Sequence, residues 1–439
     1  MSLRDRKLVS MLSAVSLALA GCTAFAQQTA ESPDNLRTEQ GSGSAPPPVA
    51  SECVKAAPGW ATQLTVGQWE RVSLNTLASQ DPRNDPDVNP NYPNSPPWNG
   101  TIGQRGVIEA WNGGAFACKY GEFGALIAYG GGHNDYYGSE IYAFDLGMRE
   151  WRRVSDPYPG PNNWPYFSGR YPDGSAIPPH TYDYVDYDEV THRFYIFKGQ
   201  HTLGPPSNST AVPVLHVFNL ETLQWEDGGM NDGVTMFSGG FSAYDPRRNV
   251  FWVQGAPTNG AAFTRIDPSV VSGSGERGEF TNYPSHTAWA NGRPLNVGAV
   301  GAIDPNNDIM VYPSFRDSQN VWARDLTRPQ EQAIAINHGG QAPSYASATG
   351  WEWSPARNAF LYWRGGGQVH ELKPPASGWR NQQWVWTRIA NSSTSPTVPR
   401  NDNGPYSKFR VATFDEFDLA IVINEGTEGH VWVMRIPND

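Results

Sequence analysis

Short apolar runs separated by polar turns recur along most of the chain. In each copy a first strand ends at a polar turn, and a second apolar run follows, such as RFYIFKG (193–199) or AFLYWRG (359–365). A third run and then a strand containing Trp, such as WRRV (151–154), complete the copy. Apolar runs of this length bounded by turn residues predict short β-strands. The copies recur every 50–65 residues or so, and a period of roughly 40–50 residues is typical of propeller blades. The marking turns lie at 187–189, 244–246, 303–305, 353–355 and 414–416, with a weaker copy at 120–122.

This repeat predicts an all-β fold, namely a β-propeller built of four-stranded antiparallel blades. We count six blades, and a seventh, degenerate blade is the alternative because the region 255–300 is poorly patterned. The last copy stops at its third strand, HVWVMRI (430–436). Near the N-terminus, WERV (69–72) matches WRRV (151–154) of the first copy. We therefore expect residues 67–73 to close the last blade as its outer strand, which would remove a free sheet edge.

The composition supports a turn-rich globular domain and excludes other classes. Aromatic residues make up 12% of the 439 residues, too many to leave in water in a disordered chain. The 45 Gly and 37 Pro argue against a helical bundle, because both residues interrupt helices. The net charge of −11 argues against a nucleic-acid partner, which usually requires a basic surface.

The N-terminus has the pattern of an export signal. Basic residues precede the apolar stretch 8–20, which is too short to span a bilayer, and LAGC (19–22) is typical of a lipoprotein cleavage site. We predict a lipoprotein-type signal peptide at 1–21 with lipidation of Cys22; Ala24-Phe25-Ala26 is the competing site for ordinary secretion. Residues 22–50 would be a flexible tether and 51–439 a single propeller domain. The chain would be a monomer of the cell envelope, as an outer-membrane lipoprotein or a secreted or periplasmic protein, and would meet a membrane only through its lipid.

Apart from the lipidated Cys22, two cysteines remain after such a cleavage, Cys53 and Cys118. An even pair in an exported protein predicts one disulfide. It would pin the segment before the closing strand to the first complete blade.

The segment GGGHNDYYGSEIYAFDL (130–146), followed by Trp151, resembles the repeat of kelch-type bacterial propellers. The glycine run, the Tyr in the third strand and the spaced Trp carry this resemblance, which covers residues 107–439 as architecture. It implies the fold and leaves the function open.

Blade geometry predicts which loops share a face. Since strands alternate in direction, the loops before the first and third strands of each blade lie together near the central channel. One such face would collect charged and titratable residues from several blades, namely His133, His180, His201, Arg316 and Arg364, with Lys408 and Arg410 near the sixth blade. Positive and titratable groups gathered on one face of an acidic protein predict an anionic ligand.

The set of His, Tyr and Arg on this face is similar to that of ulvan-lyase-type polysaccharide lyases. That resemblance implies an exported lyase that cleaves a uronate-containing acidic polysaccharide by β-elimination. Lys198 stands where such a propeller could carry Arg. The candidate catalytic residues are His133, His180 and Tyr182, and the candidate substrate-binding residues are Asn112, Asn134, Lys198, His201, Arg316, Arg364 and Arg410.

Other readings stay open at this stage. The same residues would serve a non-catalytic propeller that binds carbohydrate or protein. A glycoside hydrolase would need two carboxylates, for which Asp135, Asp317 and Glu425 are candidates. We predict no cofactor, although a metal held by His133, Asp135, His180 and His201 remains open. The four histidines expected to have no chemical role are His192, His216, His370 and His430.

Overall fold

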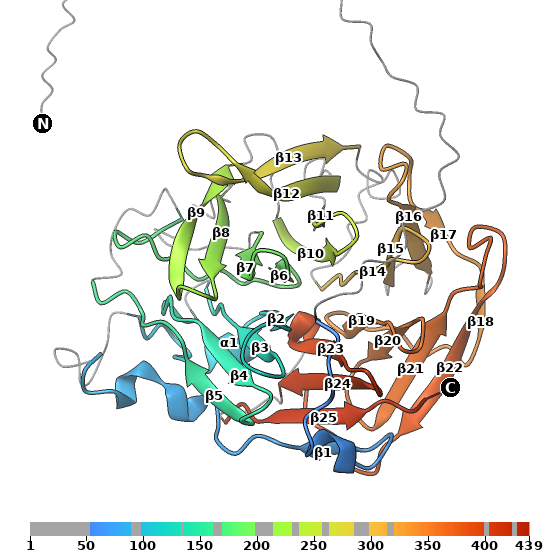
Figure 1. Ribbon diagram of the computed structural model, residues 1–439, viewed down its shortest axis with the longest axis horizontal. Helices are drawn as coiled ribbons and strands as arrows, with labels where there is room; N and C mark the ends of the chain where they lie inside the picture. Colours follow the sequence, from blue (N-terminus) through green and yellow to red (C-terminus); the bar gives the residue numbers. More distant parts are fainter. Residues whose placement is uncertain are drawn as a thin grey trace, which may run out of the picture. The chain divides into compact units, whose positions relative to one another are not determined.

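The repeated apolar runs fold into small antiparallel sheets in a propeller-like arrangement, which Figure 1 shows down one axis. These sheets belong to the compact unit Pro48–Asp439. The computed structural model describes residues 53–88, 98–132, 135–160, 169–197, 214–230, 237–256, 263–284, 298–313, 320–398, 404–423 and 428–438. The expected signal peptide at 1–21, the expected tether at 22–50 and Cys22 lie outside the described residues.

The first sheet is a simple four-stranded meander. Its order is β2-β3-β4-β5, and its strands are β2 (Gly114–Ala117), β3 (Ala125–Ala128), β4 (Tyr142–Asp145) and β5 (Glu150–Arg153). Every residue of β3 is buried, because this strand is covered on both faces. In β5 the side chain of Trp151 is buried while its neighbour Arg152 is exposed, the alternation of an outer strand with one face on the core.

Both ends of the propeller chain meet in a second four-stranded sheet. Its strands are β23 (Phe409–Thr413), β24 (Asp418–Ile423), β25 (Val431–Arg435) and β1 (Trp69–Arg71), in the order β1-β25-β24-β23. The register pairs Trp69 with Met434 and Arg71 with Trp432 in antiparallel fashion. The predicted pairing of the N-terminal strand with the last repeat is confirmed.

An eight-stranded sheet contains the next two sets of strands. The first set is β6 (Val185–Asp188), β7 (Arg193–Ile196), β8 (Val214–Asn219) and β9 (Gln224–Met230). The second set is β10 (Phe237–Asp245), β11 (Val250–Ala256), β12 (Phe263–Val271) and β13 (Arg277–Tyr283). Each set is an antiparallel meander, and the two join through a single parallel register pair, Arg277 of β13 with Gly228 of β9.

The remaining strands form a four-stranded and a five-stranded sheet. The former consists of β14 (Ala302–Asp304), β15 (Ile309–Pro313), β16 (Val321–Asp325) and β17 (Ile334–Ala335). The latter consists of β19 (Gly350–Ser354), β20 (Ala359–Trp363), β21 (Gln368–Lys373) and β22 (Trp384–Asn391), with β18 (His338–Gly340) parallel to β22 at the edge.

The turns after the first strands explain why the sequence repeat is visible. Asp188, Asp245 and Asp304 each accept a hydrogen bond from the backbone N–H two residues later, at 2.8, 3.1 and 2.8 Å. The turns then end in a left-handed residue, for example Asn249 (φ 52°) or Asp308 (φ 56°). Asn, Asp and His tolerate this conformation better than other non-glycine residues. The geometry of the turn therefore favours Asp and Asn at these positions, which is why the same polar residues recur in the sequence.

The first strands of the successive sets contact one another around the centre. β2 contacts β6, β6 contacts β10, β10 contacts β14, β14 contacts β19, β19 contacts β23, and β23 contacts β2. Aromatic side chains fill the space between neighbouring sheets. Trp363 of β20, for instance, stacks on Phe409 of β23 with ring centroids 6.0 Å apart.

The helices are short and lie in the connections. They are α1 (Gly106–Glu109) and the 3-10 turns η1 (Ala61–Gln63), η2 (Ala78–Gln80), η3 (Pro82–Asn84) and η4 (Tyr406–Lys408). Within the described residues, none is long and apolar enough to cross a membrane.

A disulfide joins Cys53 to Cys118, with Cα atoms 5.2 Å apart, as predicted. Lys55 strengthens the same junction: its Nζ donates to the carbonyl oxygens of Cys118 and Glu122, at 3.0 and 2.9 Å. The segment that precedes the closing strand is therefore held to the first sheet by a covalent bond and by hydrogen bonds.

Removing this disulfide is expected to destabilise the protein. The bond closes a loop between residues 65 positions apart, and such a cross-link usually contributes about 2–4 kcal/mol. We expect the double variant Cys53→Ser/Cys118→Ser to lose that amount in urea denaturation. Reductant should lower the stability of the wild type and leave the double variant unchanged. A wild type that is indifferent to reductant would contradict the stabilising role.

Candidate functional site

His180 is anchored by a carboxylate near the centre of the propeller. It lies shortly before β6 with only 3% of its surface exposed. Its Nε2 lies 2.8 Å from Oδ2 of Asp135, which comes from the loop between β3 and β4. A carboxylate on one ring nitrogen fixes the orientation of the imidazole and stabilises its protonated form. The two residues thus form a hydrogen-bonded pair that joins two of the loops predicted to share one face.

The local chain conformation brings the two loops together. Asn112 is fully buried; its Oδ1 accepts from the backbone N–H of Thr181 at 3.0 Å and its Nδ2 donates to the carbonyl of Gly106 at 2.8 Å. Gly132 packs so closely on the carbonyl of Pro178 that an added Cβ would lie 2.1 Å from that oxygen. Only glycine allows this approach, which brings the loop of Asp135 to the segment of His180.

Three aromatic residues with an unusual backbone conformation form a chain of ring contacts that begins at His180. Trp111, Tyr182 and Tyr406 have φ values of 47°, 48° and 46°, in the left-handed region. Each is the third residue before the first strand of its set, β2, β6 or β23. The His180 ring lies 5.0 Å from the Trp111 ring and 6.0 Å from that of Tyr182, which in turn lies 5.9 Å from Tyr406.

This conformation is held by backbone hydrogen bonds between successive loops. Tyr182 donates its N–H to the carbonyl of Trp111 at 2.7 Å, and Tyr406 donates to Ala348 at 3.2 Å. Ala348 is itself left-handed (φ 54°) and donates to Gly298 at 2.8 Å. A bulky residue in this region costs about 1–3 kcal/mol, and such strain is concentrated at functional sites. The aromatic cluster is therefore the best-defined candidate site in the described part of the chain.

The structure brings together only some of the predicted residues. His180 and Tyr182 lie side by side, and Asn112 positions the segment that carries them. Arg364 lies elsewhere, at the β20–β21 connection. The predicted residues that fall outside the described residues are His133, Asn134, Lys198, His201 and Arg316.

Lys408 and Arg410 were expected on the open face of the propeller, but the structure turns both side chains inward. Lys408 is fully buried, and its Nζ donates to the carbonyls of Ile108, at 2.9 Å, and Asn112. Arg410 has 12% of its side chain exposed. The alignment of repeats placed both residues near the face but gave no direction for their side chains, and alternation along β23 turns Arg410 toward the centre.

Arg410 connects three sets of strands across the centre. It donates to the carbonyl of Gly114 at 2.9 Å, to that of Val185 at 3.0 Å and to Oε2 of Glu352 at 2.7 Å. Asp186 lies 3.7 Å away. Burial raises the pKa of Asp186 to about 6, because the nearby guanidinium offsets only part of the desolvation.

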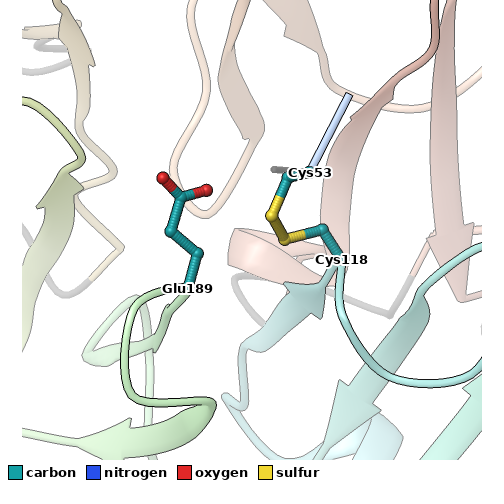
Figure 2. Close-up of side chains that lie close together, drawn as sticks. All are labelled: Cys53, Cys118 and Glu189. Carbon is teal, nitrogen blue, oxygen red and sulfur yellow. A yellow bond between two sulfur atoms is a disulfide. The ribbon is translucent and has the colours of Figure 1, made fainter. Parts of the chain in front are cut away.

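These groups line a central cavity of about 270 Å³. Its other lining residues include Tyr187, Tyr244, Trp353 and the disulfide. Figure 2 shows the joined sulfurs of Cys53 and Cys118 with Glu189 beside them. These three residues are the group of potential metal ligands found among the described residues, but the two thiols are consumed by the disulfide. In this oxidised form the group does not offer thiolates to a metal.

Comparison with known proteins adds no function to this geometry. No protein-family model and no curated protein matches this chain. The function therefore has to be argued from the site itself.

Sequence reasoning missed several members of the cluster. Asp135 was considered as a metal ligand or a hydrolase carboxylate, and not as the partner of His180. Trp111 and Tyr406 were not singled out, although both stand three residues before a first strand, as Tyr182 does. An alignment of the repeats on the first residue of each first strand, and not on the turn that follows it, would have placed these three aromatic residues at the same repeat position.

Proposed function

We propose that this chain is an exported lyase that cleaves a uronate-containing acidic polysaccharide by β-elimination. The observation that carries the proposal is the buried pair of His180 and Asp135, packed against Trp111 and Tyr182. Such a pair supplies an oriented proton acceptor, and the aromatic surroundings suit a sugar ring.

The reaction requires three functions around one sugar. A base removes the proton at C5, and the electron pair left behind forms the C4–C5 double bond. The bond from C4 to the glycosidic oxygen breaks, and an acid protonates that oxygen. A cation or hydrogen-bond donor near the uronate carboxylate stabilises the developing negative charge. The step needs no oxidant, reductant or second substrate.

We assign these functions to His180, Tyr182 and Asp135 of the candidate site and to further residues that the sequence predicted. His180 or Tyr182 acts as base or acid, since the two rings lie edge to face at 6.0 Å. Asp135 is a positioning residue that holds the imidazole and favours its charged form. His133 serves as acid or as neutraliser of the carboxylate, and Arg316 holds the carboxylate; the alternative, Arg364, lies at the β20–β21 connection, away from this cluster. Asn134, Lys198 and His201 would extend substrate binding along the same loops.

For the fold, we propose six blades of the kelch type. The closed circle of contacts among the six first strands supports this count. The single parallel register pair between β13 and β9 supports treating the eight-stranded sheet as two neighbouring blades.

For export, we propose cleavage after Gly21, a lipid on Cys22 and a tether over 22–50. The lipoprotein pattern supports the anchor, and the Cys53–Cys118 disulfide supports an oxidising compartment. The enzyme would then act as a monomer at the cell envelope, on polymers outside the membrane that carries it.

The proposal is tested by incubating the purified chain with a panel of uronate polysaccharides, with and without sulfate esters. The expected result is a rise in ultraviolet absorbance from unsaturated uronate products. Reducing-end release without such absorbance would replace the lyase by a hydrolase. Saturable binding without any product would replace it by a binding propeller.

A further inference from the structure

A second cavity lies at the connection between β20 and β21, in the five-stranded sheet shown at the lower right of Figure 1. Its volume is about 480 Å³, within the ordinary range of small-ligand pockets. The polar side chains in its wall are Ser344, Tyr362, Arg364, Gln368, His370 and Asn391. His370 had been expected to have no chemical role, so its presence in this wall needs an explanation.

Strand register places the key side chains on one face of the sheet. His370 of β21 is directly opposite Tyr362 of β20 and Arg388 of β22. Arg364 stands two residues after Tyr362, and Gln368 two residues before His370. Side chains directly opposite or two apart project from the same face. The cavity thus has a continuous polar wall across three strands.

The cavity and the strand beside it carry positive charge that is not balanced by carboxylates: Arg364 lines the cavity, and Arg388 of β22 stands opposite His370 without lining the cavity. No Asp or Glu is among the described residues that line the cavity. Neither Arg364 nor Arg388 makes an ion pair with any residue that the structure describes, whereas Arg357 of the same sheet pairs with Glu371 at 2.6 Å. Arg364 donates through Nη1 to the carbonyl of Ser344 at 3.2 Å and to its hydroxyl, which holds the guanidinium at the cavity.

The electrostatics at His370 agree with this charge distribution. Burial is the main cause that lowers the pKa of His370, and the charges of Arg388 and Arg364 lower it further. The groups that face the ring are Tyr362 from β20, Arg364 from the β20–β21 connection and Arg388 from β22. An anion bound among these cations would reverse their effect on the imidazole.

The cavity is connected to the aromatic cluster through one loop. Ser344 belongs to the loop that leads to Ala348, and the carbonyl of Ala348 accepts from Tyr406. The Tyr406 ring contacts that of Tyr182, which contacts His180. An extended polymer that occupied both places would therefore run across neighbouring loops.

We propose that this cavity binds the anionic group of a sugar, a uronate carboxylate or a sulfate ester, through Arg364 and His370, with the charge of Arg388 beside them. Its role as a subsite beside the reacting bond rests on the proposed lyase function, whereas anion binding itself does not. A guanidinium without a carboxylate partner offers charge-assisted hydrogen bonds that an anion can satisfy.

The test is calorimetric titration of the full chain with glucuronate, glucose 6-sulfate and glucose. We expect the two anionic sugars to bind and glucose to bind at least about tenfold more weakly, since it cannot form charge-assisted hydrogen bonds. The comparison of glucuronate with glucose 6-sulfate identifies which anionic group the cavity prefers. Failure of both anions to bind overturns the proposal.

Variants locate the binding. We expect Arg364→Gln to weaken binding of the preferred anion about tenfold, because it removes a charged donor from the cavity wall. Arg388→Gln should weaken binding less, because Arg388 acts only through its charge beside the cavity. Arg152→Gln is the matched control, an exposed arginine on an outer strand of another sheet. Equal binding by the wild type and by the Arg364 and Arg388 variants overturns the assignment.

A second readout works even if a variant fails to fold. In the wild type, the NMR titration of the His370 ring should show its pKa rising when the anion is added. An unchanged pKa of His370 at saturating anion contradicts the proposal. These measurements involve no turnover. Anion binding can therefore be absent while the lyase assay gives product, and anion binding can be present while the lyase assay gives none.

Discussion

Replacing His180 with alanine is expected to lower kcat/KM on the cleaved polysaccharide by about 10²–10⁴-fold, the usual contribution of a general acid or base. The substitution removes the imidazole and leaves Asp135 without its partner. The fold should survive, because the backbone hydrogen bond of Thr181 to Asn112 and that of Tyr182 to Trp111 do not involve the His180 side chain. The measurement is the initial rate of ultraviolet absorbance, with circular dichroism as the check on folding.

A matched control is available at the opposite end of the strands. His192 lies in the turn after β6 in a left-handed conformation (φ 56°) and lies 2.7 Å from the Tyr187 hydroxyl. His192→Asn keeps a residue that tolerates this backbone, so its activity should equal that of the wild type. Full activity of the His180 variant would remove His180 from the mechanism.

The role of Asp135 is separable from that of His180. Asp135→Asn keeps the shape of the side chain but removes the charge that stabilises the imidazolium. We therefore expect its pH–rate profile to shift to lower pH, because the pKa of a histidine falls when a neighbouring anion is removed. A merely structural Asp135 would change the rate at all pH values equally.

Much of the fold could be predicted because its features repeat locally. WERV (69–72) could be assigned to the last sheet because it matches WRRV (151–154). Both segments have the pattern of an outer strand with one buried face. The Asp-containing turns were visible because their side chains bond the backbone two residues on, which restricts the residue types.

The contacts between sheets were not predictable in the same way. β9 and β13 meet through Glu226, which pairs with Arg193 of its own set at 2.7 Å and with Arg277 of the next at 3.3 Å. Arg193 and Arg277 lie far from Glu226 in the sequence, and the periodic pattern of apolar residues does not predict contacts between such distant positions. The same holds for β18, which adds to the edge of β22 in a parallel direction.

The candidate site shows where repeat alignment succeeds and where it fails. The alignment placed His180 in the loop before the first strand of its blade with Tyr182 next to it, and both lie shortly before β6. It could not identify Asp135 as the partner of His180, because that contact depends on the close approach of Gly132 to Pro178. It also counted Arg410 as a surface cation, although the partners that bury it come from β2, β6 and β19.

The stability of the centre should depend strongly on Arg410. Its guanidinium is held by Glu352, with Asp186 nearby, and removal of one member of a buried ion pair costs about 3–5 kcal/mol. We expect Arg410→Met to lose this amount at neutral pH in urea denaturation, because the carboxylates would remain buried without their cation. Arg328→Met is the control: its ion pair with Glu331 is largely exposed, so we expect a change below about 0.5 kcal/mol.

The loss should also depend on pH, with a definite sign. The folded-state pKa of Asp186 is about 6, above its ordinary value of 3.8, so the folded protein binds this proton more tightly than the unfolded chain does. Ionisation of Asp186 therefore costs stability as the pH rises from about 4 to 6. Without Arg410 that cost increases, since the guanidinium is the charge that lowers this pKa. The deficit of Arg410→Met should thus be smallest below pH 6, where the folded wild type and the folded variant both hold the proton, and grow as the pH rises above about 6, where only the wild type releases it. A deficit that stays constant from about pH 5 to about pH 8, or one below about 1 kcal/mol at pH 7, would show that the carboxylates do not depend on Arg410.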